Sequence, residues 1–372
     1  MRGRILRILI GYFIDGKHSG IDKYILSFIN TIKSEDVYID VLTSNSNQEI
    51  MDQYVKYNVS TIKIPRLRNP YKQYKKMNAI FKENLYDIAY FNISEAFNAV
   101  GIYSAYKNKI KKIIVHSHAS DVDVRNSAKR FILQKLNQFF KSKIAKWGNT
   151  FLACSKKAAQ WLYPKRIIQN NEYEIIYNAI DDRKFKYNEE IREKKRKELK
   201  LEDKVILGHV GNFCYQKNQE FLVELINKLD KNKYHMLLIG VGNDFEMIKD
   251  KIDKMNLNKN ITLLGLRKDV NELMQAFDIF LLPSNFEGLP IVGVEAETAG
   301  LPCIFSDKIT DEILLTENSI SLPLDTEKWK EKIEEFTTKK RLTGEELGEK
   351  IENYYLENQK RQFWDLIKFA IS

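Results

Sequence analysis

The strongest chemical pattern in the chain is a pair of carboxylates, Glu287 and Glu295, separated by eight positions. Glu287 lies in the turn Ser284–Pro290, directly after an apolar run, and Glu295 lies near the start of the next expected helix. Two carboxylates at such a turn suit bidentate hydrogen bonds to the vicinal hydroxyls of a ribose or a hexose. Backbone N–H groups at the helix N-terminus would favour hydroxyls or a phosphate, and these belong to Gly288, Leu289 and Ile291. The spacing alone is equally compatible with two solvated acids.

A lysine ahead of another expected helix provides the complementary charge. The apolar run Val205–Val210 is followed by Gly211-Asn212 and then by Lys217. A cation between a glycine turn and a helix is well placed for a diphosphate, and a charge-assisted contact of this kind is worth about 1.5–3 kcal/mol. Taken alone, Lys217 also fits an exposed loop. Gly242, after the next apolar run, is a weaker signal because the third glycine of a dinucleotide fingerprint is missing.

In the first half of the chain, Gly20 lies between the first apolar run and the first expected helix, where a glycine lets backbone approach a ligand. The run Lys112–Val115 leads into His116-Ser117-His118, and alternation along a strand allows the two imidazoles to share one face. A metal site would need further ligands, and the sequence shows no partner spacing for them. The histidines are therefore either structural or in contact with a substrate, and the sequence does not tell His116 from His118 in the second role.

Short apolar runs alternate with helical patterns along the chain, which is typical of βα units around parallel sheets. In the first half we expect strands at 7–13, 38–44, 87–92, 112–116, 151–154 and 175–177, and helices at 20–32, 71–84, 95–106, 127–144 and 155–161. In the second half we expect strands at 205–210, 235–239, 261–264, 279–282 and 302–305, and helices at 219–229, 245–255, 270–276 and 292–299. The charged stretch 181–204 is interpreted as a linker with an exposed helix, and the tail 345–371 as helical. Ligands of open α/β sheets bind at the carboxyl ends of the strands, where the residues above fall.

Length and composition favour a globular protein of two domains, because 372 residues exceed one ordinary core of about 150 residues. The 44% apolar and 30% charged residues exclude a disordered chain. The three cysteines are too far apart for a disulfide framework or a zinc site.

Arg2, Arg4 and Arg7 precede the apolar stretch Ile8–Ile14, but this stretch is short for a signal peptide and has no small-residue cleavage site. We expect a buried first strand and a cytoplasmic protein, since no run reaches the about 20 apolar residues of a membrane span.

The net charge of +10 is concentrated in the first half of the chain. Residues 1–180 carry 29 Lys and Arg against 14 Asp and Glu, whereas residues 181–372 carry 31 against 36. A basic half favours an anionic partner, and no nucleic-acid-binding motif accompanies the charge. Within it, the segment Arg125–Lys146 holds seven cations and no acid, interleaved with apolar residues at helical spacing. Either that stripe packs on the sheet, or the cations, aided by Lys72, Lys75 and Lys76, face an anionic membrane surface.

Taken together, these motifs resemble the retaining glycosyltransferases of family four, and within them the branch that makes bacterial capsules and exopolysaccharides. The resemblance covers nearly the whole chain and rests on an ordered set of segments rather than on any single one. In the first half these are residues 114–118, 153–155 and 176–181. In the second half they are residues 208–218, 238–242, 264–270, 278–284 and the carboxylates Glu287 and Glu295 with Ala296.

The resemblance implies an α/β protein of the GT-B fold, with two Rossmann-like domains whose parallel sheets face each other across a cleft. Residues 1–180 would form the acceptor domain, 205–350 the nucleotide-sugar domain, and 351–372 a helix that returns to the first domain. It also implies that Glu295 holds the ribose, Glu287 the transferred sugar or its neighbouring phosphate, and Lys217 the diphosphate, with His118 touching the sugar. The remaining donor contacts would come from Gly20, Gly211, Asn212, Gly242, Gly288, Leu289, Pro290 and Ile291.

Two positions depart from the family pattern. Asn212 stands where many members have an arginine that serves as a second phosphate cation, so phosphate binding would depend more on Lys217 and backbone amides. Ser19-Gly20 replaces the usual glycine pair of the first loop, with Asp22 in place of a glutamate.

The function that follows from the resemblance is transfer of a hexose-type sugar from a nucleoside diphosphate, expected to be UDP, with retention of configuration. No metal or other cofactor is expected. The acceptor would be a hydroxyl of a glycan or of a polyprenyl-diphosphate-linked sugar, presented at the inner face of the cytoplasmic membrane. Two alternatives remain, a sugar-nucleotide epimerase of the same fold and a catalytically silent subunit that binds nucleotide and activates a partner transferase.

Overall fold

The structure is a computed structural model that describes residues 5–13, 20–44, 51–52, 54–65 and 69–371. Ser19, Arg2, Arg4 and the segment Asp15–His18, which the sequence analysis considered, lie outside these residues. The contacts divide the chain into two compact units. The first comprises Met1–Val122, Asn126–Asn178 and Glu357–Ser372, and the second comprises Asp123–Arg125 and Ala179–Leu356.

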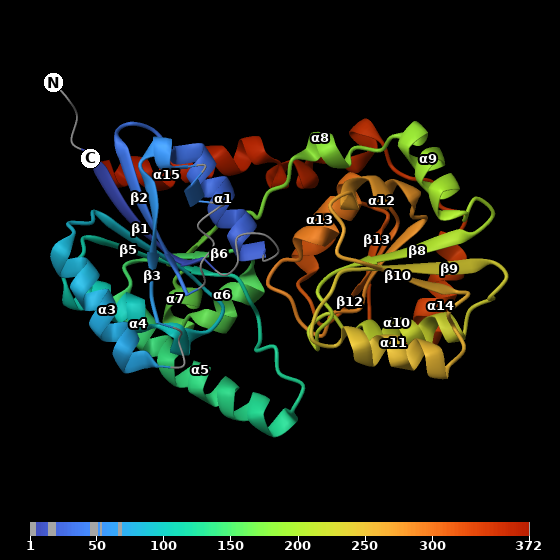
Figure 1. Ribbon diagram of the computed structural model, residues 1–372, viewed down its shortest axis with the longest axis horizontal. Helices are drawn as coiled ribbons and strands as arrows, with labels where there is room; N and C mark the ends of the chain where they lie inside the picture. Colours follow the sequence, from blue (N-terminus) through green and yellow to red (C-terminus); the bar gives the residue numbers. More distant parts are fainter. Residues whose placement is uncertain (1–4, 14–19, 45–50, 53, 66–68, 372) are drawn as a thin grey trace. The chain divides into compact units, whose positions relative to one another are not determined.

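The first unit is built on a seven-stranded parallel sheet with the strand order β3-β2-β1-β4-β5-β6-β7 (Figure 1). The sheet strands are β1 (Leu6–Phe13), β2 (Val37–Thr43), β3 (Val59–Lys63), β4 (Ile88–Ile93), β5 (Lys112–Ser117), β6 (Thr150–Ala153) and β7 (Glu174–Ile175). The α-helices are α1 (Gly20–Ile32), α3 (Pro70–Glu83), α4 (Val100–Lys107), α5 (Ser127–Trp147), α6 (Lys156–Leu162), α7 (Lys165–Gln169) and α15 (Leu356–Ile371). Two short 3-10 turns are η1 (Val55–Tyr57) and η2 (Ala96–Asn98).

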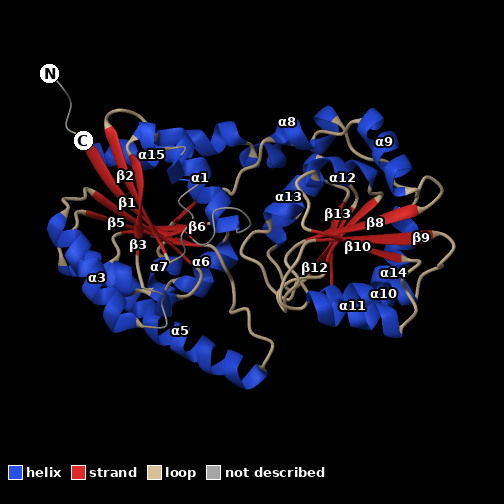
Figure 2. Ribbon diagram, in the orientation of Figure 1, coloured by secondary structure: helices blue, strands red, loops and turns tan. Residues whose placement is uncertain are grey.

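The second unit repeats this architecture with a six-stranded parallel sheet in the order β10-β9-β8-β11-β12-β13. The strands are β8 (Val205–Val210), β9 (Tyr234–Ile239), β10 (Ile261–Gly265), β11 (Ile279–Leu282), β12 (Cys303–Ser306) and β13 (Ser319–Leu322). The α-helices are α8 (Asp182–Phe185), α9 (Glu189–Leu199), α10 (Gln219–Asn227), α11 (Phe245–Lys254), α12 (Val270–Ala276), α13 (Ile291–Thr298) and α14 (Thr326–Phe336), and the 3-10 turns are η3 (Asp311–Ile313), η4 (Gly344–Leu347) and η5 (Glu349–Tyr354). In both units the strands lie inside and the helices outside (Figure 2).

The alternation of side chains along parallel strands explains the two cores. Every second residue of β1, β2 and β4 points to the same face of the first sheet, where α1 and α15 cover it. In the second unit, alternate residues of β8, β9 and β11 meet the apolar faces of α10, α11 and α14. Because both faces of each sheet are covered, the strands are almost continuously apolar, as expected for parallel sheets.

The last helix belongs to the first unit, as the sequence analysis expected. Phe363 is fully buried and packs edge-on against the rings of Tyr24 and Phe28 of α1, with centroids 5.3 and 4.9 Å away. Gln359 donates a hydrogen bond to the carbonyl oxygen of Tyr177 (2.7 Å) and accepts one from the hydroxyl of Ser27 (2.6 Å). Apolar packing and specific polar contacts therefore fix α15 on this unit.

The charged stretch 181–204 differs from the interpretation as a linker, because its contacts place it within the second unit. Lys195 of α9 is buried and its ammonium group meets the carboxylates of Asp269 and Glu272, both at 2.9 Å. A buried charge is tolerated only when it is paired, so this helix face is fixed on α12 rather than solvated.

Two strands were missed by the sequence analysis, β3 and β13, and both lie at the edge of a sheet. Their residues are mostly half-buried and include serines and a threonine, so neither forms a continuous apolar run. An edge strand has only one neighbour to pack against, and its sequence signal is correspondingly weak.

Replacing Phe363 with alanine is expected to destabilise the first unit by about 3–5 kcal/mol, the usual cost of truncating a fully buried aromatic side chain. The adjacent Trp364 is 40% exposed and serves as the matched control, for which Trp364→Ala should cost about 1 kcal/mol or less. Differential scanning calorimetry of both variants measures the two shifts in Tm. Equal shifts would show that α15 is not held by its buried face.

Candidate functional site

The strand order of the second sheet reverses between β8 and β11, which pair in parallel through Ile279–Leu207 and Phe280–Gly208. The loops that leave the carboxyl ends of these two strands are joined by hydrogen bonds. The N–H of Asn285 donates to the carbonyl oxygen of Gln216 (2.8 Å), and its side chain donates to that of Tyr215 (2.7 Å). Ligands of open α/β sheets bind at such a reversal, so the two loops mark the candidate site.

Glu287 and Lys217, which the sequence analysis expected to bind the donor, form an ion pair at this reversal. The Lys217 ammonium lies 2.6 Å from Oε1 of Glu287, and Glu287 as a whole is only 6% exposed. Ser284 donates its hydroxyl to the same Oε1 (2.9 Å), while Gln216 donates to Oε2 (2.9 Å). A carboxylate removed from water is stabilised by this set of donors, which also fixes its direction. Gln216 and Ser284 were not named individually in the sequence analysis, although they lie within the segments 208–218 and 278–284 quoted there.

The glycines of this region are required by close approach of backbone. A Cβ at Gly242 would lie 2.3 Å from the carbonyl oxygen of Phe213, and one at Gly240 would lie 2.0 Å from that of Gly211. Gly211 itself is covered by the Lys217 side chain, whose Cδ would be 3.1 Å from an added Cβ. The glycines thus hold the loop after β9 against the loop after β8. A packing role accounts for Gly242 whether or not it also contacts a ligand.

A buried histidine supports the loop that contains Asn212. Gln219 donates from Nε2 to the carbonyl oxygen of Asn212 (2.9 Å) and to Nε2 of His209 (3.2 Å). The His209 Nδ1–H is then left to donate to the carbonyl oxygen of Leu281 (2.9 Å). Burial lowers the pKa of His209 to about 4, so this neutral arrangement persists at physiological pH. The side chain of Asn212 is exposed and uncharged. The positive charge of the arginine in the family pattern is therefore missing at this position.

The segment after Glu287 leads into helix α13. Gly288, Leu289 and Pro290 are buried, and Pro290 is the residue that caps α13, which begins at Ile291. The cap makes no side-chain hydrogen bond to the first turn, where the positive end of the helix dipole lies. Glu295 follows one turn into the helix and is half-buried. The expected donor residues of the second half therefore lie on the loops after β8, β9 and β11 and at the start of α13.

His118 of the first unit follows β5 and is held by an asparagine that the sequence analysis missed. Asn92, at the end of β4, donates from Nδ2 to the carbonyl oxygen of Gly11 (3.3 Å). Its Oδ1 is therefore free to accept from Nε2–H of His118 (2.9 Å), which leaves Nδ1 of the imidazole unprotonated. The ring of Tyr24 from α1 packs edge-on against His118, with centroids 5.1 Å apart.

His116 is fully buried, whereas His118 is partly exposed, and this difference separates their roles. His116 bonds through Nδ1 to the hydroxyl of Tyr90 (2.8 Å), and Tyr90 in turn bonds to Tyr24 (2.7 Å). Its Nε2 has no hydrogen-bond partner among the described residues. Of the two histidines, only His118 can reach a ligand, and Gly20 lies with it at the carboxyl edge of the first sheet as the first residue of α1.

Comparison with known proteins identifies the family. The sequence profile described as Glycosyltransferase Family 4 matches residues 18–184, and that of Glycosyl transferases group 1 matches residues 190–354. The chain belongs to the glycosyltransferases of family 4. A crystal structure of Anabaena HepE in complex with UDP-glucose superposes with a TM-score of 0.77 at 15% identity, covering 98% of this chain and 100% of that one. The two parallel-sheet units therefore have the GT-B fold.

Two relatives illustrate the similarity. EpsF of Bacillus subtilis, named as a glycosyltransferase, is 33% identical over 189 residues, which are 49% of each chain, so the match spans about half of that protein. An Escherichia coli enzyme named UDP-Gal:alpha-D-GlcNAc-diphosphoundecaprenol alpha-1,3-galactosyltransferase is 25% identical over 78% of this chain and 76% of its own.

His118 is expected to stay neutral between pH 5 and 8, because burial lowers its pKa to about 3 from an ordinary value near 6.5. In the unfolded chain His118 binds a proton near pH 6.5, whereas in the folded chain it does so only near pH 3. The free energy of unfolding therefore decreases as the pH falls below 6.5. Nitrogen-15 NMR, assigned with a His118→Gln variant, should show a protonated Nε2 and a constant signal. A titration midpoint near 6.5 would contradict the arrangement.

Proposed function

We propose that this family 4 glycosyltransferase transfers a hexose-type sugar from a nucleoside diphosphate, UDP in the first instance, to a hydroxyl group. The observation that carries the proposal is the Lys217–Glu287 pair, 2.6 Å apart and directed by Ser284 and Gln216, at the strand-order reversal of the second sheet. One cation and one carboxylate with fixed directions are the groups needed for a diphosphate and for sugar hydroxyls.

Each residue then has a role in donor binding. Lys217 neutralises the diphosphate, and the backbone amides of Gly288, Leu289 and Ile291 contribute further donors at the start of α13. Glu287 accepts hydrogen bonds from the transferred sugar, and Glu295 accepts them from the two ribose hydroxyls. Gly211, Asn212, Gly242 and Pro290 shape the backbone around the nucleotide, while Gly20 lets the first loop approach the diphosphate.

In the reaction, the bond between the anomeric carbon and the diphosphate oxygen breaks, and a bond from that carbon to the acceptor oxygen forms. The acceptor hydroxyl loses its proton to the departing diphosphate on the same face, so the configuration is retained. Negative charge on the diphosphate grows as the bond breaks, and Lys217 stabilises it through an electrostatic contact that exists before the reaction. His118, neutral and unprotonated at Nδ1, accepts a hydrogen bond from a sugar hydroxyl. No metal ion takes part.

The acceptor we propose is a glycan or a polyprenyl-diphosphate-linked sugar of a bacterial cell-surface polysaccharide. Support comes from the Escherichia coli relative, whose name specifies a UDP-galactose donor and a diphosphoundecaprenol-linked acceptor. A further relative in Erwinia amylovora is named an amylovoran biosynthesis glycosyltransferase, at 30% identity over 26% of this chain.

Lys217→Ala is expected to lower kcat on the order of a hundred- to a thousandfold, the usual cost of removing one preorganised charge from a transition state. Release of nucleoside diphosphate from a panel of UDP-sugars, with and without EDTA, measures this and tests the metal-free mechanism. Lys228→Ala is the matched control, because Lys228 forms a comparable ion pair with Glu327 (2.7 Å) on α14. Sugar interconversion without an acceptor would favour an epimerase, and a Lys217→Ala variant with more than half of the wild-type rate would exclude the role of the lysine.

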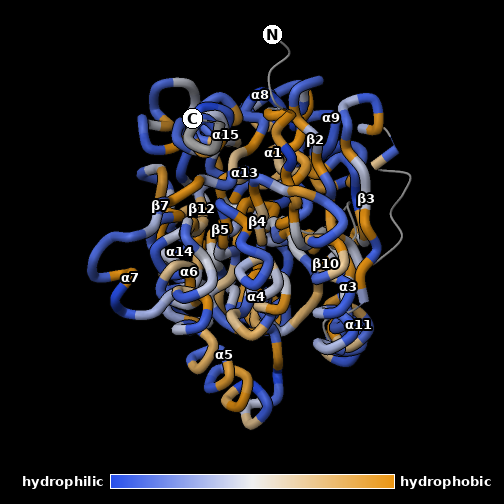
Figure 3. Tube along the Cα trace, turned by 90° about the vertical axis from the view of Figure 1, so that its left-hand side faces the viewer, coloured by the Kyte–Doolittle hydropathy of each residue, from blue (hydrophilic) through white to orange (hydrophobic). Residues whose placement is uncertain are grey.

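We further propose that α5 binds the inner face of the cytoplasmic membrane, where such an acceptor is presented. Of the side chains along this helix, only Asn137 and Ile144 are buried. Phe131, Ile132, Leu136 and Phe139 are 58%, 65%, 39% and 63% exposed, so the apolar stripe does not pack on the sheet over this stretch. Figure 3 shows hydrophobic and hydrophilic residues intermixed along α5. Contiguous exposed apolar residues mark an interaction surface.

The cations of α5 surround these apolar residues. Lys135 and Lys143 lie over the rings of Phe131 and Phe139, with the ammonium groups 5.2 and 5.8 Å from the ring centroids. Arg130 instead pairs with Asp121, and the preceding Arg125 pairs with Glu220 and Asp244, so neither is available to lipid as first expected. None of the described helices is long and apolar enough to cross a membrane.

An Ile132→Glu, Phe139→Glu double variant is expected to lose binding to anionic liposomes, because it removes two exposed apolar side chains and adds two negative charges. Flotation at low and high salt measures binding, which should weaken as salt screens the lysines. Leu85→Glu is the control, since Leu85 is 83% exposed in the same unit but lies outside α5. Equal binding to neutral and anionic liposomes, or equal loss in the control, would contradict this surface.

A further inference from the structure

A second cluster of positive charge lies in the second unit, away from Lys217 and Glu287. It surrounds a cavity of about 330 Å³ that is lined by Tyr187, Arg192, Asp278, Phe336, Thr337, Lys339, Lys340 and Arg341. Ligand sites in proteins begin at about 300 Å³, so the cavity has room for a small solute. Its lining holds four cationic side chains and one carboxylate.

The cavity lies at the amino ends of the strands, at the opposite edge of the sheet from the candidate donor site. Asp278 directly precedes β11, and its Oδ2 accepts a hydrogen bond from the N–H of Ile206 at the start of β8 (2.7 Å). Lys217 and Glu287 follow the carboxyl ends of these same strands. A ligand here would not compete with the sugar nucleotide for space.

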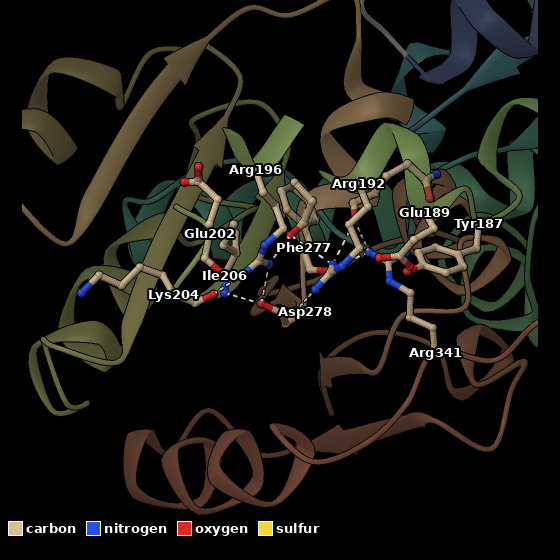
Figure 4. Close-up of polar contacts among 12 residues, drawn as sticks. Tyr187, Glu189, Arg192, Arg196, Glu202, Lys204, Ile206, Phe277, Asp278 and Arg341 are labelled. Atoms are coloured by element: carbon tan, nitrogen blue, oxygen red, sulfur yellow. Dashed lines mark hydrogen bonds and ion pairs between the residues drawn. The ribbon is translucent and has the colours of Figure 1, made fainter. Parts of the chain in front are cut away.

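The one carboxylate of the lining is already shared. Arg192 contacts Oδ1 of Asp278 at 2.5 Å, and Arg196 contacts Oδ2 at 3.0 Å. Figure 4 shows these two arginines converging on Asp278, with Tyr187 and Arg341 beside Arg192. The exposed carboxylate of Glu189 bonds to the hydroxyl of Tyr187. The lining therefore keeps a surplus of positive charge.

Arg341 contributes to that surplus from a fixed position. Its two terminal nitrogens donate to the carbonyl oxygens of Met274, Gln275, Phe277 and Ala299, at 2.7–2.8 Å. Burial, together with repulsion from Arg192, lowers its pKa to about 9, so it remains charged at neutral pH. Its guanidinium also lies 4.7 Å from the ring centroid of Tyr187. No carboxylate forms an ion pair with Arg341 among the residues that the structure describes.

The arginines alone have a structural explanation, because they donate to the last carbonyl groups of α12 and so complement the negative end of that helix. The two lysines are not part of this cap. Lys339 bonds to Oδ1 of Asn318 at 3.3 Å and lies over the ring of Phe336, while Lys340 is exposed. Both lysines line the same cavity, so they add positive charge there that the cap does not require.

We propose that this cavity binds a small phosphate-bearing solute, with Arg192, Lys339 and Lys340 around the phosphate group. A phosphate offers several acceptor oxygens and a negative charge that offsets the surplus of the lining. Arg192 is already held by Asp278 and the end of α12, so it loses little side-chain freedom on binding. The phosphate would be either inorganic phosphate or a phosphate ester with a group of about the size of a sugar.

The test is calorimetric titration of the full chain, saturated with UDP, with inorganic phosphate and with a hexose phosphate at constant ionic strength. Lys340→Glu should weaken the binding of both at least tenfold, since it reverses a charge at the cavity without removing any side-chain contact. Lys328→Glu, on the exposed side of α14, is the matched control and should leave binding unchanged. The neutral hexose should not bind.

Three results would overturn the proposal: no saturable phosphate binding to the wild-type chain, equal binding to Lys340→Glu and wild type, or equal binding of the neutral hexose. Lys217→Ala separates this site from the donor site. Phosphate binding that is lost in Lys217→Ala but kept in Lys340→Glu would place the phosphate at the donor loops. Failure of UDP to bind would count against the proposed function. The comparison of Lys340→Glu with Lys328→Glu would still decide whether this cavity binds phosphate.

Discussion

The carboxylate of Glu287 is almost completely removed from water, and a charge in that position must be surrounded by donors. It receives them from Lys217, Gln216 and Ser284, which come from two different loops. Both loops therefore have to reach the same point, and they do so because β8 and β11 are neighbours at the place where the strand order reverses. The pairing of these two strands thus determines whether the ion pair can exist at all.

The supporting interactions around the pair follow from the same requirement. Glycines at positions 240 and 242 allow the loop after β9 to lie against backbone that any side chain would displace. Gln219 holds the loop after β8 by a hydrogen bond to the carbonyl oxygen of Asn212, and His209, fixed in one tautomer by Leu281 of β11, accepts a second bond from Gln219. In the first unit, a hydrogen bond from Nδ2 of Asn92 to the carbonyl oxygen of Gly11 fixes the orientation of the Asn92 amide. Its Oδ1 then accepts from Nε2–H of His118 and so fixes the tautomer of that imidazole. In both units a polar side chain is held in one orientation by a hydrogen bond to the backbone of another strand or loop.

The sequence was informative where pattern and chemistry coincide. Central strands such as 205–210 and 279–282 are wholly or mostly apolar runs, and they were predicted with the boundaries that the structure has. Glu287 and Lys217 were singled out because each follows such a run, at the edge of the sheet where ligands of open α/β sheets bind, and their roles in donor binding stay predictions. The edge strands β3 and β13 were missed because half-buried residues leave no clear period in the pattern of apolar residues.

Asn92, Gln216 and Ser284 were missed as well. A positioning role depends on which residues the fold brings near, and spacing along the chain does not reveal that. For the same reason residues 181–204 were mistaken for a linker, as the partners of Lys195 lie about seventy positions further on.

The chain passes through the first unit, builds the second, and then returns with α15 to complete the first. The apolar face formed by Tyr24 and Phe28 has its last partner, Phe363, more than three hundred positions later in the sequence. During synthesis from the N-terminus, the second unit can therefore fold while that face is still uncovered. Until α15 has been synthesised, the rings of Tyr24 and Phe28 lack this apolar partner, and that face of the first unit stays open to water.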